Sequence, residues 1–191
     1  QAYIENYTGE MNFTQHVNDG DMQFKCDDGS GSTEVYFYLD GSMADGTYNY
    51  TRWNDGGVIT FGGDQDLRIW HDPSNSSSYM RNYTNDLYIE NTANDKDILF
   101  RCDDGSGGVT TYFKLDGSSA SGGTVYTNWE DNSRITLGAG NDMQLYHDGS
   151  NNYVDITLGD LYFTNYADDK DIIFRSDDGS GGVTEYLKID G

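Results

Sequence analysis

The sequence lacks the features of a helical or membrane-spanning protein. It contains one proline, Pro73, and no apolar residues at helical spacing, while 24 glycines and many Asn, Asp and Ser residues favour short elements joined by turns. Its apolar runs, such as residues 35–39, are too short for a transmembrane helix or the core of a signal peptide. We therefore expect no membrane insertion, and nothing in the sequence supports export.

Positive charge is also scarce. Eleven Lys and Arg residues stand against 33 Asp and Glu residues, which gives a formal net charge of −22 at pH 7. Nucleic acid carries the same sign, so we expect no DNA or RNA binding. Hydrophobic residues make up only 35 % of the chain, and 16 of them are tyrosines with a polar end. Each chain alone therefore has little purely aliphatic surface to bury.

The strongest positive signal is internal repetition. The string Asp-Asp-Gly-Ser-Gly begins at Asp27, Asp103 and Asp177, so successive copies lie 76 (103 − 27) and 74 (177 − 103) residues apart. We divide the chain into repeat 1 (residues 1–76), repeat 2 (residues 77–150) and a partial repeat 3 (residues 151–191). Stacked repeats contact mainly their neighbours, so they tolerate an incomplete copy better than a compact domain does.

Within the repeats, an acidic residue is often followed by apolar residues at alternating positions. Alternation with a period of two, bounded by Asp, Gly and Ser, predicts short strands with one buried face. The predicted strands that begin with this pattern are residues 21–24, 66–69, 86–89, 97–100, 142–145, 160–163 and 171–174. Residues 58–61, 109–115 and 183–189 are predicted as strands by the same alternation without the leading acidic residue.

Each predicted strand offers only two or three inward side chains, such as Ile98, Phe100 and Cys102. One chain cannot close a core with so narrow a stripe. Three copies around a common axis can, because each supplies one wall and the sheet edges pair between chains. We therefore predict an all-β protein, an elongated repetitive fibre of short strands, of the intertwined homotrimeric β-prism or β-helix type. A dimer and a monomeric solenoid are the alternatives.

Several longer phrases resemble the repeats of marine bacteriophage tail fibres. They are Gly-Asn-Asp-Met-Gln-Leu-Tyr-His-Asp-Gly-Ser-Asn at residues 140–151, Gly-Asp-Leu-Tyr at residues 159–162, and Asp-Asp-Lys-Asp-Ile-Ile-Phe-Arg-Ser-Asp-Asp-Gly-Ser-Gly-Gly at residues 168–182. Residues 66–117 resemble these repeats almost as well. Together the matching copies cover nearly the whole chain.

The resemblance implies a homotrimeric tail fibre on a virion, assembled in the host cytoplasm. Such a fibre is structural, is not an enzyme, and binds a host cell-surface receptor or polysaccharide through multivalent contacts. Two alternatives are a tailspike-type polysaccharide depolymerase with a carboxylate pair and a bacterial surface repeat adhesin. The depolymerase is disfavoured because the similar copies lack a singular, site-like insertion, and the adhesin would need an export signal or anchor.

The repeated acidic turns are candidate calcium sites. Hard cations prefer several oxygen ligands on a sharp glycine turn, which Asp103, Asp104, Asp177 and Asp178 would supply. The turns lack the spacing of an EF-hand, and Asp and Gly are the usual residues of hairpin turns. A purely structural turn is therefore the favoured interpretation.

Two histidines recur in phase with the apolar positions of their strands. In a trimer, three copies of His71 or of His147 would meet at the axis and bind a transition metal. The favoured alternative is a structural histidine bonded to a backbone carbonyl or to a neighbouring chain. No other cofactor is expected.

Aromatic and thiol side chains complete the candidate residues. Trp53, Trp70 and Trp129 could stack on sugar rings, but the recurrence of Trp53 and Trp129 favours packing against the next repeat. Cys26 and Cys102 are replaced by Ser176 in the third copy, so we expect reduced, buried thiols that form no disulfide. We predict no catalytic residue.

Overall fold

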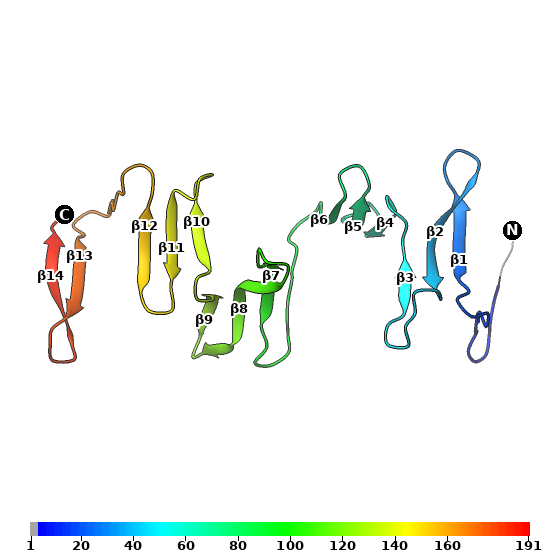
Figure 1. Ribbon diagram of the computed structural model, residues 1–191, viewed down its shortest axis with the longest axis horizontal. Helices are drawn as coiled ribbons and strands as arrows, with labels where there is room; N and C mark the ends of the chain where they lie inside the picture. Colours follow the sequence, from blue (N-terminus) through cyan, green and yellow to red (C-terminus); the bar gives the residue numbers. More distant parts are fainter. Residues whose placement is uncertain (1–3) are drawn as a thin grey trace. The chain divides into compact units, whose positions relative to one another are not determined.

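The computed structural model describes residues 4–191, which form β-strands joined by turns and loops (Figure 1). This part of the chain contains no helix, and therefore none that could cross a bilayer. The strands lie in five small antiparallel sheets. The prediction of an all-β protein with short strands is confirmed.

The first of two structural units ends at Tyr88 and contains two three-stranded sheets. Strands that follow each other along the chain are neighbours in each sheet, in the orders β1-β2-β3 and β4-β5-β6. The strands are β1 (Met22–Asp27), β2 (Thr33–Asp40), β3 (Tyr50–Arg52), β4 (Val58–Phe61), β5 (Leu67–Asp72) and β6 (Ser77–Asn82).

The second unit begins at Ile89 and contains three sheets with the orders β7-β8-β9, β10-β11-β12 and β13-β14. Its strands are β7 (Ile98–Asp103), β8 (Val109–Ser121), β9 (Thr124–Trp129), β10 (Arg134–Leu137), β11 (Met143–His147), β12 (Asn152–Ile156), β13 (Ile172–Asp177) and β14 (Val183–Ile189).

The three hairpins that carry the Asp-Asp-Gly-Ser-Gly turn share one register. In β1–β2, β7–β8 and β13–β14, the ladder shifts by one residue directly after Phe24, Phe100 and Phe174, respectively. A β-bulge of this kind bends the strand and increases its twist. The three hairpins with the same turn sequence thus have the same register and the same bulge position.

The predicted repeat boundaries fall inside hairpins. The boundary at 76/77 lies in the turn between the paired strands β5 and β6, and the boundary at 150/151 lies in the turn between β11 and β12. The boundaries therefore mark the phase of the sequence repetition and do not coincide with the edges of sheets.

Two of the predicted strands do not form. Residues 86–89 and 160–163 have the alternating pattern, yet they lie in loops after β6 and β12. In the first loop, Asn82 Nδ2 donates to the carbonyl oxygens of Thr84 (2.5 Å) and Asn85 (2.9 Å), and Asn85 has a φ of +48°. The chain thereby leaves the ladder, and both segments keep their apolar side chains exposed because no described strand pairs with them.

Each sheet has one face that carries mainly apolar side chains. Cross-strand partners in an antiparallel ladder share a face, so the register assigns the members. We call these surfaces the apolar faces. Their members are Met22, Phe24, Phe37, Leu39 and Trp53; Ile59, Phe61, Leu67, Ile69 and Met80; Ile98, Phe100, Phe113, Leu115 and Trp129; Ile135, Leu137, Met143, Leu145, Val154 and Ile156; and Ile172, Phe174, Leu187 and Ile189.

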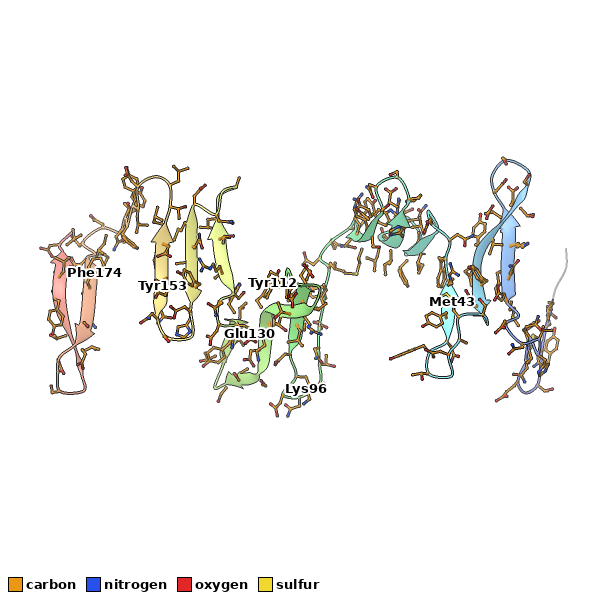
Figure 2. All side chains as sticks on the ribbon, viewed as in Figure 1. Met43, Lys96, Tyr112, Glu130, Tyr153 and Phe174 are labelled. Atoms are coloured by element: carbon orange, nitrogen blue, oxygen red, sulfur yellow. The ribbon has the colours of Figure 1, made fainter. Side chains whose placement is uncertain are left out.

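Nothing in the described chain covers the apolar faces. No hydrophobic side chain among residues 4–191 is buried, and Phe174, labelled in Figure 2, is 45 % exposed. The chain exposes 15570 Å². Two compact domains of half its mass would together expose only about 11,000 Å². The hydrogen-bonded sheets are therefore formed, but residues 4–191 of the single chain form no hydrophobic core.

Candidate functional site

The repeated acidic turns are closed by their own carboxylates. In the turn between β7 and β8, Asp104 Oδ1 accepts hydrogen bonds from Ser106 N and Ser106 Oγ, both at 2.8 Å, and from Gly108 N at 3.0 Å. The turns that contain Asp28 and Asp178 have the same set of bonds. One oxygen of each carboxylate thus accepts three hydrogen bonds, in addition to the backbone bond that closes each turn, such as Asp104 N to Gly108 O at 3.1 Å.

The preceding aspartates of these turns are engaged in the same way. Asp103 Oδ2 accepts from Gly105 N at 2.9 Å, and Asp177 Oδ2 accepts from Gly179 N at 3.1 Å. Among residues 4–191, no group of three or more His, Cys, Asp or Glu side chains is arranged to hold a metal ion. The structural role of the four candidate aspartates is observed, and calcium binding stays a prediction.

We expect Asp104→Ala to lower the unfolding temperature by a few degrees, because three donors lose their acceptor. The hydroxyl and the amide of Ser106 lower the pKa of Asp104 by stabilising its charged form. Asp104→Asn, which keeps the Oδ1 acceptor, should lower the unfolding temperature less. Circular dichroism measured during heating gives the unfolding temperature of both variants.

Calcium binding has its own test. If the turn binds calcium, calcium chloride will raise the wild-type unfolding temperature above that in sodium chloride of equal ionic strength.

His71 and His147 lie on the apolar faces of their sheets, as the sequence phase indicated. His71 Nδ1 lies 3.1 Å from Ser78 Oγ. His147 Nδ1 lies 2.8 Å from Asp131 Oδ1 and 3.1 Å from the amide nitrogen of Gly149. With a proton, this nitrogen donates to Asp131, and without one it accepts from Gly149. Both histidines therefore have partners in their own chain, and the axial metal site stays a prediction.

Trp53 and Trp129 end two equivalent aromatic ladders. Ring centroids are 5.4 Å apart between Trp53 and Phe37, and Phe37 stacks in turn on Phe24 at 4.5 Å. Trp129 occupies the same place beside Phe113, at 5.3 Å. These stacking partners belong to strands of the same sheet, and packing of the tryptophans against the next repeat stays a prediction. Stacking across neighbouring strands explains why these tryptophans recur.

The structure also brings three of the candidate residues together. Trp53, Trp70 and His71 line an open cleft of about 440 Å³ in the first unit. Ile59 and Ile69 of the apolar face belong to the same lining, together with Trp70 and Tyr79 from the other face of the β4-β5-β6 sheet, so the cleft is not confined to one face. A surface with this composition suits contact with another apolar surface better than the binding of a polar sugar.

The opposite face of the β4-β5-β6 sheet is cationic and aromatic. Trp70 stacks on Tyr79 at 4.7 Å, and the guanidinium of Arg81 lies 5.1 Å from the ring centre of Trp70. Arg68 stands directly opposite Arg81 in the ladder, and its guanidinium lies 4.6 Å above the ring of Tyr83. We call Arg68, Trp70, Tyr79, Arg81 and Tyr83 the arginine–aromatic face.

Two buried aspartates fix the segments that follow β2 and β8. Asp40, only 4 % exposed, accepts from Ser42 Oγ at 2.7 Å and from Met43 N at 3.1 Å, and it pairs with Arg52 at 2.9 Å. These bonds, led by that of the Ser42 hydroxyl, lower the pKa of Asp40. They fix the chain direction at the end of β2.

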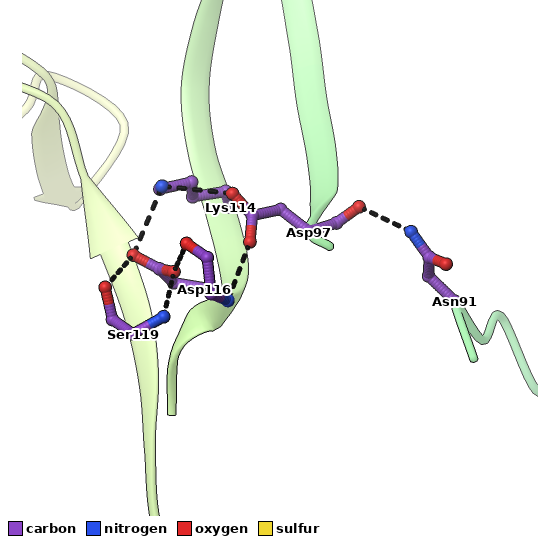
Figure 3. A network of polar contacts seen from close by, with 6 residues as sticks. Asn91, Asp97, Lys114, Asp116 and Ser119 are labelled. Carbon is purple, nitrogen blue, oxygen red and sulfur yellow. Dashed lines mark hydrogen bonds and ion pairs between the residues drawn. The ribbon is translucent and has the colours of Figure 1, made fainter. Parts of the chain in front are cut away.

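Asp116 is the counterpart of Asp40 in the second unit and is 5 % exposed (Figure 3). It accepts from Ser118 Oγ at 2.8 Å and from Ser119 N at 2.9 Å. Lys114 Nζ lies 3.1 Å from both Asp116 and Asp97. The Ser118 hydroxyl and its neighbours hold the pKa of Asp116 far below its ordinary value.

Sequence reasoning did not identify this network, although its signal was visible. Each buried aspartate precedes a glycine, in Leu-Asp-Gly at residues 39–41 and 115–117. A Cβ on Gly117 would overlap with the carbonyl oxygen of Lys96, and one on Gly41 would overlap with that of Gly20. The chain approaches itself too closely here for any side chain. The recurring Asp-Gly pair is thus a structural requirement of the fold.

The two cysteines are free, as expected, but both are exposed in the single chain. The residues of one molecule therefore do not bury these two thiols, in contrast to the prediction.

Comparison with known proteins finds no matching family model, no similar curated protein and no similar solved structure. The proposed function therefore depends on the residues and faces described above.

Proposed function

We propose that this chain is a structural and host-recognition segment of a bacteriophage tail fibre, in which three identical copies intertwine as a β-prism or β-helix. The observation that carries the proposal is the set of apolar faces, one on each sheet, that the described chain leaves open. An identical copy is the partner that carries a matching face at every sheet.

The exposed area is large enough for such an assembly. The chain exposes about 4,500 Å² more than two compact domains of half its mass would. Obligate interfaces bury about 2,000–5,000 Å² in total over both partners. The excess therefore suffices for contacts with two neighbours, as each chain of a closed ring requires.

The open sheet edges support a ring, and the narrow apolar faces support three copies in it. Every sheet has two edge strands with unpaired backbone groups, and head-to-tail pairing of such edges closes into a cyclic assembly. Each sheet contributes an apolar face of only four to six side chains. Three such walls enclose one layer of side chains without leaving a channel, and residues 86–89 and 160–163 then find partner strands in another copy.

The assignment to a phage fibre comes from the resemblance of residues 66–117 and 140–182 to fibre repeats. On this proposal the protein is located on the virion, assembles in the host cytoplasm with reduced cysteines, and is not an enzyme. It binds a receptor or polysaccharide through three chains at once, so weak sites gain strength from avidity.

Gold-labelled antibodies against the purified chain test the assignment. We expect gold on the fibres of the tailed virus whose genome encodes the chain, and no chain shortening when host polysaccharides are incubated with the protein. Label on the surface of uninfected bacterial cells would instead identify an adhesin. Shortened polysaccharide would identify a depolymerase. Either result would overturn the proposal.

A further inference from the structure

We infer that the arginine–aromatic face of the β4-β5-β6 sheet binds an anionic saccharide, with Arg68 and Arg81 holding its carboxylate or sulfate group. This inference rests on the proposed function, because it takes the opposite, apolar face of the sheet to be covered by neighbouring chains. Ile59, Ile69 and Met80 lie on that opposite face, and Met80 is 51 % exposed in the single chain. The arginine–aromatic face then remains on the outside.

The arginine pair lowers the stability of the sheet unless an anion binds between its two positive charges. Arg68 and Arg81 are directly opposite in the ladder, and like charges in that position destabilise a sheet. The chain has 33 acidic residues, yet neither guanidinium forms an ion pair with a carboxylate among residues 4–191. Two unpaired guanidinium groups on one sheet face are therefore available to an external anion.

One donor of the pair also lacks a partner. The Nε atom of Arg68 is buried and has no hydrogen-bond partner in the described chain. Buried donors are normally satisfied, and an exception calls for an explanation such as a bound group. Guanidinium groups bind carboxylate and sulfate oxygens in pairs of parallel hydrogen bonds, so an external anion at Arg68 and Arg81 would contact their terminal Nη groups, while Arg68 Nε itself is shielded.

The aromatic rings supply a second element of saccharide recognition. Trp70 and Tyr79 stack next to the arginine pair and are only half-buried. An aromatic face accepts the apolar side of a sugar ring. Asp72, the last residue of β5, already accepts bonds from the amide of Ser74 (2.9 Å) and its hydroxyl (2.6 Å). The platform thus combines stacking with unpaired positive charge.

The equivalent sheet of the second unit provides an internal comparison. Gln144 and Asp155 stand opposite each other there, in the places of Arg68 and Arg81. Their polar groups are satisfied within the sheet, because Arg134 donates to Gln144 at 2.5 Å and Tyr146 donates to Asp155 at 2.9 Å. The framework therefore folds without an arginine pair, so the pair in the first unit is an addition to the structural requirement.

The high negative charge of the whole chain does not forbid local anion binding. At physiological ionic strength the Debye length is about 8 Å, so the groups in contact with the ligand outweigh distant carboxylates. Binding should accordingly weaken as salt is added.

Isothermal titration of the purified full chain tests the inference. The probes are an oligogalacturonate, a sulfated galactan oligosaccharide and a neutral gluco-oligosaccharide of equal length. We expect at least one anionic probe to bind the wild type, with the neutral probe at least about tenfold weaker. The comparison of carboxylated with sulfated probes identifies which anionic group is preferred.

The test variant is Arg68→Gln/Arg81→Gln, and the matched control is Arg101→Gln/Arg175→Gln, which removes the same charge from two other hairpins. The test variant should lose affinity at least about tenfold, whereas the control should retain it. Equal affinity in wild type and test variant, equal loss in both variants, or no binding of either anionic probe overturns the inference.

Light scattering on the same samples distinguishes failure of the saccharide site from failure of the trimeric fibre. A trimer without binding refutes only this inference, and a monomer refutes the proposed function.

Discussion

Substitution of Leu145 by Asp should convert the assembled protein into single chains of 21.3 kDa. Leu145 lies at the centre of an apolar face, between Ile135 on β10 and Val154 on β12. In an assembly that covers this face, the new carboxylate would be buried without a partner at a cost of about 3 kcal/mol or more per chain. Three copies of the change cost about 9 kcal/mol, which lowers the association constant roughly 10⁶-fold.

The control for this experiment lies one residue away on the same strand. Gln144 points to the opposite face, where it accepts a hydrogen bond from Arg134. Gln144→Glu adds the same charge without placing it on the apolar face, and it should leave the mass unchanged. Light scattering measures both variants, and circular dichroism should show loss of strand signal in Leu145→Asp, since a lone chain has no core. An unchanged mass for Leu145→Asp would show that the face is not an interface.

The second large effect is expected in acid. Hydrogen bonds or ion pairs lower the pKa of ten aspartates in the folded chain. These are Asp28, Asp40, Asp45, Asp72, Asp97, Asp104, Asp116, Asp148, Asp171 and Asp178. A carboxylate with a lowered folded pKa contributes stability that is fully present above its unfolded pKa of about 3.9 and is lost as the pH falls further. We therefore expect the unfolding temperature to drop steeply below about pH 4.

Asp116→Asn separates this effect from the general charge of the chain. The amide that this substitution introduces cannot ionise, so the variant should melt at least several degrees lower than wild type at pH 7 and show a shallower loss in acid. Asp64→Asn is the control, because Asp64 is exposed and makes no side-chain hydrogen bond among residues 4–191. A wild-type unfolding temperature that keeps rising below about pH 4 would contradict the role assigned to these carboxylates.

The sequence predicts the strands of this protein well where alternation is bounded by turns, as in β7 and β13. It fails at residues 86–89, because the Asn82 amide and the positive φ of Asn85 redirect the chain after β6. Alternation reports which side of a segment is apolar. It does not report whether a partner strand is available within the same chain.

The candidate sites also fall into two groups: those set by the local sequence and those set by contacts between distant residues. Turn aspartates such as Asp104 follow local rules, so their structural role could be predicted from Asp-Asp-Gly alone. The pairing of Arg68 with Arg81 depends on the register of β5 and β6, and the burial of Asp116 depends on where the chain folds back near Lys96. Arg68 and Arg81 are 13 (81 − 68) positions apart, and the close approach of Gly117 to Lys96 spans 21 (117 − 96), so a local pattern such as Leu-Asp-Gly marks one end of the contact but not its partner.

We propose that identical copies cover the apolar faces that one chain leaves open. The most direct test is the mass of the wild-type protein in solution, measured by light scattering at neutral pH. We expect a single species at three times 21.3 kDa. A monodisperse, folded monomer of 21.3 kDa would contradict it.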